Sequence, residues 1–239
     1  MINPTTLAKV KDYADQYQAN GVISIDDFLE ADFAAEQIKL IHYATEWEIA
    51  TLLEGRPFVA GLEEFSKAPA HERQQFVNDL LMYARNNPFQ YFYEYIRLKG
   101  VDTKPNEKFA KLIDFYNSDE LKNFIGAIIG ESDIADIDGK ITRYMPGHFL
   151  KKHCDTGVND KAERKCAYVL SLTKNWEADW GGLFHMLDDQ GRVNNTIMPS
   201  FNTLNIFRVP QDHLVSQVAN YAPTARFSIT GWAWGSNYS

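Results

Sequence analysis

The chain has 239 residues, of which 45% are hydrophobic and 13% aromatic, so it can bury a sizeable core and is not a disordered chain. Its formal net charge of -8 at pH 7 argues against a partner with a phosphate backbone, and we expect no nucleic-acid partner. Its apolar runs are too short to span a bilayer, so we expect no membrane partner. Its charged N-terminus lacks the apolar core of a signal peptide, and its two cysteines fit reduced thiols, which together predict a cytoplasmic protein.

Residues 1–138 are expected to be a mainly helical support region. The segment NPTTLAKVKDYADQYQ places apolar residues at helical spacing after a threonine cap, namely Leu7, Val10, Ala14 and Tyr17. Further helices are predicted through FAAEQIKLIHYA, capped by Asp32, through AHERQQFVNDLLMYARN, and through DELKNFIGAIIG, opened by Ser118 and ended by Gly130. GVISIDDFL and WEIATLL read as strands. Residues 54–117, which include the aromatic FQYFYEYIRL, are assigned to the support and the substrate entrance.

From Gly139 the pattern changes to short runs rich in β-branched and aromatic residues, namely KITRYM, KCAYVLSLT, GGLFHML, TLNIFRV and RFSITGWAW. Clusters of Gly, Pro, Asn and Asp separate these runs, which is typical of a sandwich or jelly roll. The predicted fold class is mainly β with supporting α. We expect one domain over residues 1–239, with a jelly-roll core at 139–239 and the N-terminal helices packed outside it.

The stretch RYMPGHFLKKHCDTG, residues 143–157, contains the first candidate metal ligands. Residues i and i+2 of a strand point to the same side, so His153 and Asp155 can aim at one point if the strand of FLKKHCD continues through them, while Cys154 faces away. His213, just past a strand and a proline in FRVPQDHLVSQV, is the candidate third ligand. Two imidazoles and one carboxylate with open positions are the ligand set of non-haem Fe(II) oxygenases.

Each of these polar residues also has an ordinary explanation. His213 taken alone fits a surface loop, and His148 after Pro-Gly fits a turn. His185, on the LFHML strand, is a core or pocket histidine that we keep as a reserve ligand. Asp212 fits a solvated turn residue or a hydrogen-bond partner of a ligand.

Arg226 begins the alternating strand RFSITGWAW, and Ser228 lies two positions on and so on the same side. An arginine at a strand start is usually exposed. If it is buried beside a hydroxyl, however, it can bind a carboxylate through two parallel hydrogen bonds. Together with the three candidate ligands, it supplies what an oxygenase with a dicarboxylate cosubstrate requires.

At these residues the sequence resembles the Fe(II)- and 2-oxoglutarate-dependent oxygenases, and within them the prolyl 4-hydroxylase-like branch. The matching pieces are, in order, RYMPGHFLKKHCDTG, RKCAYVLSLTKNWEADWGGLFHM, PSFNTLNIFRVPQDHLVSQV and RFSITGWAW. The upstream SDELKNFIGAIIGESDI is similar to the helix before the catalytic core in the ribosomal-protein prolyl hydroxylase group. The resemblance implies a double-stranded β-helix, which is a jelly roll, as the core.

The resemblance also implies roles for single residues. The iron ligands would be His153, Asp155 and His213. Arg226 matches the residue that pairs with the distal carboxylate of 2-oxoglutarate, with Ser228 beside it, and Tyr144 matches a tyrosine that reaches the same carboxylate. Trp232 lines the substrate side or belongs to the core. No catalytic side chain is implied beyond the metal centre.

The implied reaction uses Fe(II), 2-oxoglutarate and O2, and it yields succinate and carbon dioxide while an unactivated C–H bond is hydroxylated. Halogenating relatives lack a carboxylate at the position of Asp155, so the resemblance implies hydroxylation. The expected acceptor is a prolyl residue in a protein or peptide, and the alternative is a free amino acid or other small metabolite. A cupin-like metalloenzyme that does not use 2-oxoglutarate, and a silent binding module on the same fold, stay open as rival classes.

Overall fold

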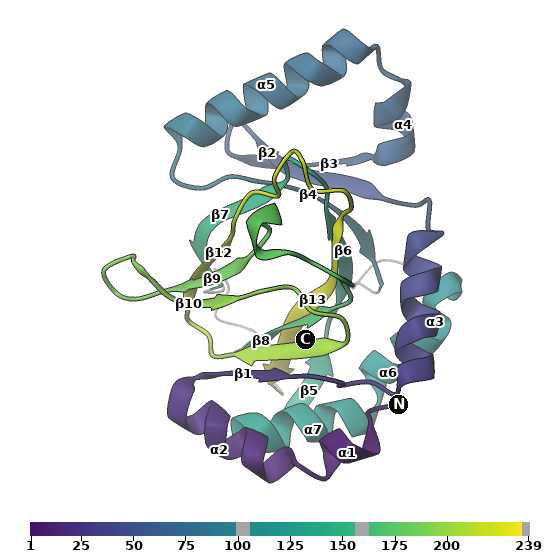
Figure 1. The fold of residues 1–239 in the computed structure, drawn as a ribbon, viewed down its shortest axis with the longest axis vertical. Helices are drawn as coiled ribbons and strands as arrows, with labels where there is room; N and C mark the ends of the chain where they lie inside the picture. Colours follow the sequence, from purple (N-terminus) through teal and green to yellow (C-terminus); the bar gives the residue numbers. More distant parts are fainter. Residues whose placement is uncertain (99–105, 156–162, 236–239) are drawn as a thin grey trace.

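The computed structural model describes residues 1–98, 106–155 and 163–235 as a curled antiparallel β-sheet with helices on its outside (Figure 1). Its helices are α1 (Pro4–Leu7), α2 (Val10–Asn20), α3 (Ala31–His42), α4 (Leu62–Lys67), α5 (Ala70–Asn86), α6 (Ala110–Asn117) and α7 (Asp119–Ile129), with short 3-10 turns at Glu107–Phe109 and Ala178–Trp180. Its strands are β1 (Val22–Ile25), β2 (Glu48–Leu53), β3 (Arg56–Gly61), β4 (Tyr91–Arg97), β5 (Ile134–Ile137), β6 (Lys140–Tyr144), β7 (Phe149–Cys154), β8 (Arg164–Ser171), β9 (Phe184–Leu187), β10 (Val193–Ile197), β11 (Thr203–Phe207), β12 (Asp212–Val215) and β13 (Arg226–Gly235).

The described strands form one antiparallel path in the order β1-β11-β8-β13-β6-β4-β7-β12-β9-β10, with β2 and β3 extending from β4 and β5 pairing with β13. The path curls until its two halves face each other. The ring of Phe184 on β9 therefore packs against the ring of Phe207 on β11, with 5.1 Å between their centroids. Two facing antiparallel sheets with an apolar interior make a jelly roll. The predicted double-stranded β-helix core, mainly β with helices outside, is confirmed.

β4 lies in the middle of this path, within residues for which the sequence predicts helical support. It pairs with β2 along one edge and with β6 and then β7 along the other. Because side chains alternate along a strand, Tyr91, Tyr93 and Tyr95 share one face, which lines the interior of the jelly roll. Phe92 and Ile96 point to the opposite face and join apolar clusters there. Residues 1–138 thus contribute part of the sheet as well as its support.

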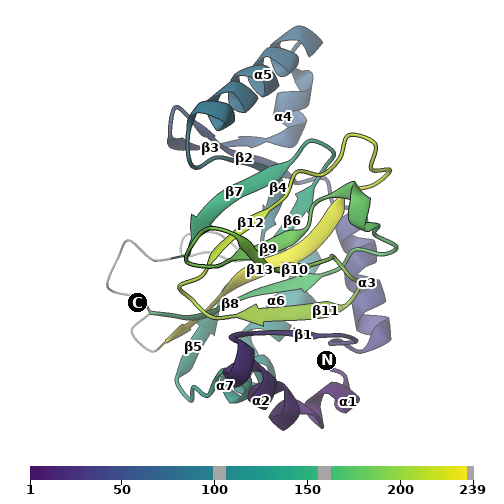
Figure 2. The same cartoon turned by 60° about the vertical axis from the view of Figure 1, so that its left-hand side comes forward.

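Helices cover the outside of the larger half of the sheet. Phe115 of α6 and Phe124 of α7 belong to one buried core with Leu170 of β8 and Ile229 of β13. α4 and α5 pack instead on the β2–β3 hairpin at the other end of the molecule (Figure 2). Within the residues that the structure describes, no helix has both the length and the apolar character needed to cross a bilayer.

The ends of α7 follow the sequence prediction. The hydroxyl of Ser118 accepts the N–H of Leu121, and Gly130 takes a left-handed φ of 79° just after the last turn. The helix predicted after a threonine cap is instead two helices, α1 and α2, and the cap of α1 is Asn3, whose side chain accepts the N–H of Thr5. The predicted cap Asp32 lies inside the first turn of α3, whose cap position is Glu30.

Candidate metal centre

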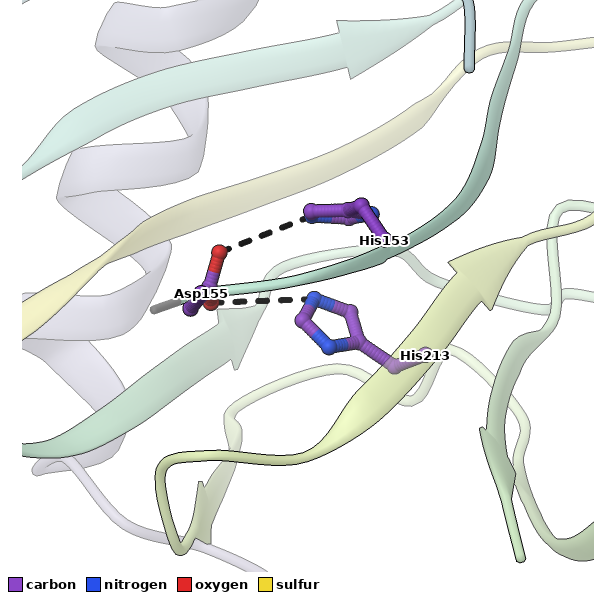
Figure 3. A group of neighbouring side chains, drawn as sticks. All are labelled: His153, Asp155 and His213. Carbon is purple, nitrogen blue, oxygen red and sulfur yellow. Dashed lines mark ion pairs between the residues drawn. The ribbon is translucent and has the colours of Figure 1, made fainter. Parts of the chain in front are cut away.

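β7 and β12 are paired so that His153 and His213 stand directly opposite each other in the register. Asp155 lies one residue beyond β7, and its carboxylate turns back toward both rings (Figure 3). Its Oδ1 lies 3.5 Å from Nε2 of His153, and its Oδ2 lies 3.7 Å from Nε2 of His213. Two atoms bound at right angles to one metal, each at about 2.1 Å, would be about 3 Å apart, so this spacing suits a single ion.

Both histidines are held in the tautomer that can bind a metal. Nδ1 of His153 lies 3.0 Å from the carbonyl oxygen of Lys151, and Nδ1 of His213 lies 2.8 Å from that of Gln211. A carbonyl oxygen only accepts hydrogen bonds, so each Nδ1 carries the proton and each Nε2 presents its lone pair toward Asp155. Burial, followed by the nearby His153, lowers the pKa of His213, which favours the neutral ring that metal binding requires.

The carboxylate of Asp155 is fixed by Trp232 of β13, whose indole N–H donates to Oδ2 at 3.1 Å. Arg164 of β8 donates to the backbone carbonyl of Asp155 at 2.6 Å, and its guanidinium lies over the Trp232 ring at 4.2 Å. Burial would raise the pKa of Asp155, but the neighbouring His153 and His213 bring this pKa below its ordinary value. The site therefore offers an ionised, oriented carboxylate.

The donor set fits iron of the non-haem type. Two imidazole nitrogens and one carboxylate oxygen suit Fe(II), and three protein ligands leave positions for small molecules. In the described part of the chain, these three side chains are the group of His, Cys, Asp and Glu residues close enough to share an ion, with ligand atoms within 4.8 Å of one another. They are only 5–19% exposed, so bulk water is largely kept from the centre.

A cavity of ≈ 260 Å³ borders the three side chains, and Arg226 lies in its wall. The residue is only 3% exposed, and its Nε has no hydrogen-bond partner among the described residues. Burial lowers its pKa, yet an arginine in a protein stays protonated. A buried cation that lacks a counter-ion is costly, so this position favours an anionic ligand in the cavity.

Tyr144 stands opposite Arg226 in the β6–β13 register and lines the same cavity, with the guanidinium carbon 5.2 Å from its ring centroid. Burial raises the pKa of Tyr144, so its hydroxyl stays neutral and can donate a hydrogen bond. Ser228 lies on the same side of β13 as Arg226 but is fully buried, with its Oγ 2.9 Å from Oγ1 of Thr142. Thr142 contributes to the cavity wall, and Ser228 supports Thr142.

His185, the reserve ligand, does not join the metal group. In the register of β9 and β12, Met186 rather than His185 stands opposite His213. Neighbouring residues of a strand point to opposite faces, so His185 points away from the centre, where its Nδ1 lies 2.9 Å from Oγ1 of Thr196. Strand β12, which the sequence pattern does not reveal, sets this arrangement, and it places His213 in a strand rather than in the surface loop that this residue alone suggests.

The other polar residues of the stretch have separate roles. Asp212 forms an ion pair with Lys152 at 3.1 Å and stands opposite Cys154 in the register, so both Asp212 and Cys154 face away from the metal group. His148 lies in the turn between β6 and β7, as expected, but it is buried and its ring packs on Phe92 at 4.2 Å.

Some contributors to the site could not be found from motifs. The contact of Trp232 with Asp155 joins residues 77 positions apart, so no local pattern indicates it. The tyrosines of β4, by contrast, have a signal in the printed sequence, since FQYFYEYIRL repeats tyrosine at every second position. That alternation is the mark of a strand with one aromatic face.

Comparisons with known proteins agree with this geometry. Residues 139–234 match the family model described as the 2OG-Fe(II) oxygenase superfamily. This part of the chain is similar to the 2OG-Fe(II) oxygenases. Members of the superfamily use Fe(II), 2-oxoglutarate and O2, and the matched segment contains the candidate ligands together with Arg226 and Trp232.

The chain is also similar to prolyl hydroxylases. It is 27% identical over 156 residues to prolyl 3-hydroxylase OGFOD1 of Mus musculus, which covers 54% of this chain and 28% of the mouse protein, so it spans only part of that relative. A prolyl-4-hydroxylase structure from Pseudomonas putida aligns with a TM-score of 0.56 and 19% identity, covering 94% of this chain and 97% of that one. A prolyl hydroxylase from Trichoplax adhaerens, solved with a hypoxia inducible factor peptide fragment, aligns with a TM-score of 0.62 and 15% identity over 98% and 94% of the two chains. These structural likenesses show a shared fold.

Proposed function

We propose that the chain is an Fe(II)- and 2-oxoglutarate-dependent dioxygenase that hydroxylates an unactivated C–H bond, with iron held by His153, Asp155 and His213. One observation carries the proposal. Three candidate metal-ligand side chains converge on a cavity whose wall also contains the buried guanidinium of Arg226, whose Nε has no hydrogen-bond partner among the described residues. A metal site alone would not need that cation, whereas a dicarboxylate cosubstrate that binds the metal at one end requires a positive partner for the other end.

When bound, Fe(II) and 2-oxoglutarate supply the oxidation, in which O2 places one oxygen atom on the substrate and one on the succinate formed with carbon dioxide. The residues of the chain position these molecules. Arg226 would offer two parallel N–H donors to the distal carboxylate, and the neutral hydroxyl of Tyr144, which lines the same cavity, would donate to the same group. Trp232 keeps the carboxylate of Asp155 turned toward the two histidines.

We propose a prolyl residue in a protein or peptide as the acceptor. The similarity to proteins named as prolyl hydroxylases supports this choice, and their names mention both the 3 and the 4 position, so the proposal leaves the position on the ring open. A free amino acid or other small metabolite is the alternative acceptor. The net charge of -8 supports the expectation of no nucleic-acid partner, and the unpaired cysteines Cys154 and Cys166 support a cytoplasmic location.

Anaerobic titration of the purified apoprotein with Fe(II) and 2-oxoglutarate tests the cosubstrate assignment, because their joint binding gives a visible metal-to-ligand charge-transfer band. We expect the band in the wild type and its loss in His153→Ala. If metal binds and no band forms, the role of Arg226 is refuted and the cupin-like class is favoured.

Succinate release tests turnover. Asp155→Ala removes a proposed ligand and should abolish succinate formation, whereas Asp212→Ala removes a carboxylate that faces away from the centre and should leave it unchanged. Full turnover in Asp155→Ala would refute the ligand assignment. Mass spectrometry of a peptide and amino-acid screen, which reads the gain of one oxygen atom, then separates the two kinds of acceptor.

A further inference from the structure

The strand that carries His153 contains a β-bulge. β7 pairs with β12 at Leu150 and again at His153. Two residues of β7, Lys151 and Lys152, lie between these pairs, whereas β12 has a single residue, Leu214, at that point. The extra residue lets Leu150 and His153 line the same cavity although they are three positions apart in the sequence. The bulge therefore sets the direction in which His153 points.

The sheet itself holds this bulge only in part. The ladder between β4 and β7 ends at the pair of Tyr91 and Leu150, and one backbone bond continues beyond it, from the N–H of Lys151 to the carbonyl of Gln90 at 2.9 Å. On the other edge of β7, the pairing with β12 is interrupted at Lys151 and Lys152. A bulge disrupts the ladder locally, so contacts from outside the sheet have to fix the backbone here.

The side chain of Lys151 makes such a contact. Its ammonium donates to the carbonyl oxygen of Ala84 at 2.6 Å and to that of Asn87. Ala84 lies in the last turn of α5, and the residue four positions on is Pro88, which has no N–H to donate to this carbonyl. The negative end of the helix dipole also favours a cation there. Lys151 thus ties the bulge to the end of a helix of 17 residues.

The ring of His153 depends on the same atoms. The backbone carbonyl of Lys151 accepts the Nδ1–H of His153 at 3.0 Å, which leaves Nε2 free for a metal. The connection from α5 to β4 reaches the ring as well, since Phe89 packs against His153 with 5.4 Å between the ring centroids. The end of α5 and the residues after it therefore support the ring from two directions.

We infer that Lys151 is a positioning residue, which holds the bulge of β7 against the C-terminal end of α5 and so keeps the ring of His153 aimed at the metal. The inference rests on the proposed iron site and adds to it a support from residues 70–90, outside the segment that matches the oxygenase family. Without the ammonium, the carbonyl of Lys151 is free to turn away. The Nε2–H tautomer of His153, which cannot bind iron, then becomes populated.

Ring ¹⁵N chemical shifts of the metal-free protein test the inference, because they distinguish the two neutral histidine tautomers. The spectra are recorded above the ordinary histidine pKa of about 6.5. We expect Lys151→Met to mix the tautomers of His153 and to keep the Nδ1–H tautomer of His213, which another carbonyl holds. Lys152→Met is the matched control, since it removes the same charge from the next residue, whose ammonium pairs with Asp212. That variant should leave both rings unchanged.

Iron affinity, measured by anaerobic competition with a chelator, gives the second readout. Loss of a group that supports a metal ligand lowers metal affinity about 10- to 100-fold, and Lys151 acts one step further out. Lys151→Met should therefore raise the Fe(II) dissociation constant about tenfold, the lower end of that range. Lys152→Met should keep the wild-type constant. Lys151→Arg keeps a cationic donor at this position and should recover most of the affinity.

Phe76→Leu separates positioning from general stability. Phe76 of α5 packs on Phe58 and Phe65, so its truncation should lower the unfolding temperature and leave Fe(II) affinity unchanged. An unchanged His153 tautomer in Lys151→Met would overturn the inference, and so would an equal loss of affinity in Phe76→Leu. If Lys151→Met does not fold, Lys151→Gln, which keeps an amide donor on a shorter side chain, takes its place with the same criteria.

The same preparations separate this inference from the proposed function. If the wild type forms the charge-transfer band while Lys151→Met keeps its tautomer and its affinity, the role of Lys151 falls and the oxygenase function stands. If Lys151→Met loses the tautomer while the wild type never forms the band, Lys151 stands as the support of His153 and the cosubstrate proposal falls.

Discussion

Replacing Trp232 by phenylalanine should weaken metal binding without removing any proposed ligand. The change deletes the indole N–H that donates to Oδ2 of Asp155 at 3.1 Å and leaves an aromatic ring in place. A hydrogen bond to a charged acceptor contributes about 1.5–3 kcal/mol. Only the share that differs between metal-free and metal-bound protein enters the affinity, and loss of such a supporting bond typically lowers metal affinity about 10- to 100-fold. We therefore expect the dissociation constant for Fe(II) to rise by at least about tenfold.

Competition with a chelator of known affinity under anaerobic conditions measures this constant. Trp47→Phe is the matched control, because the indole N–H of Trp47 donates to the carbonyl of Ala44 at 3.0 Å, away from the metal group. That variant should keep wild-type Fe(II) affinity even if its unfolding temperature falls. Equal affinity in Trp232→Phe and the wild type would refute the view that the indole holds the carboxylate in its ligating orientation.

Three further outcomes are expected. Arg226→Met should weaken 2-oxoglutarate binding at least about 100-fold in isothermal titration, because two charge-assisted bonds are lost. Urea unfolding of this variant should show no loss of stability, because the change removes a buried charge whose Nε has no hydrogen-bond partner among the described residues. Burial lowers the pKa of His148 from the ordinary 6.5 to about 4, so the unfolded chain takes up a proton at this residue at higher pH than the folded chain does. The free energy of unfolding should therefore fall by about 3 kcal/mol as the pH drops from 6.5 to about 4. His148→Leu should remove this loss, as measured by urea unfolding across that range. Gly181→Ala should lower the unfolding temperature much more than Gly191→Ala. Both glycines have a positive φ, but a Cβ at Gly181 would lie 2.1 Å from a backbone oxygen, whereas a Cβ at Gly191 would meet no atom within 4 Å. Equal shifts in the two variants would contradict this reasoning.

The candidate site could be predicted where its residues lie at fixed spacing on one strand. His153 and Asp155 are two positions apart, and the alternation of a strand is enough to place them together. Arg226 could be proposed as a carboxylate partner because Ser228 lies on the same side of its strand and the candidate ligands call for a cosubstrate, whereas its burial is known only from the structure. His213 could be proposed as the third ligand from its place after a strand and a proline, and the structure positions it through β12, whose four residues are too few to form a recognisable pattern.

The parts that could not be predicted depend on pairing between distant segments. β4 joins the jelly roll because its edges meet β2 on one side and β6 and β7 on the other, and these partners lie about 40 to 60 positions away. The alternation of tyrosines indicates a strand, yet it does not say which sheet the strand enters. The place of Ser228 behind Thr142 likewise depends on the pairing of β13 with β6.

The walls of the metal-centre cavity come from two different stretches of this chain. The proposed iron ligands and Arg226 lie within residues 139–234, which match the oxygenase family, whereas Tyr91 and Tyr93 lie on β4 in the segment before it. The two stretches meet in the cavity wall, where Trp232 lies together with Tyr91 and Tyr93. The segment before the matched residues therefore shapes the space in which a substrate would meet the metal, while the residues that hold and orient the ligands belong to the matched part.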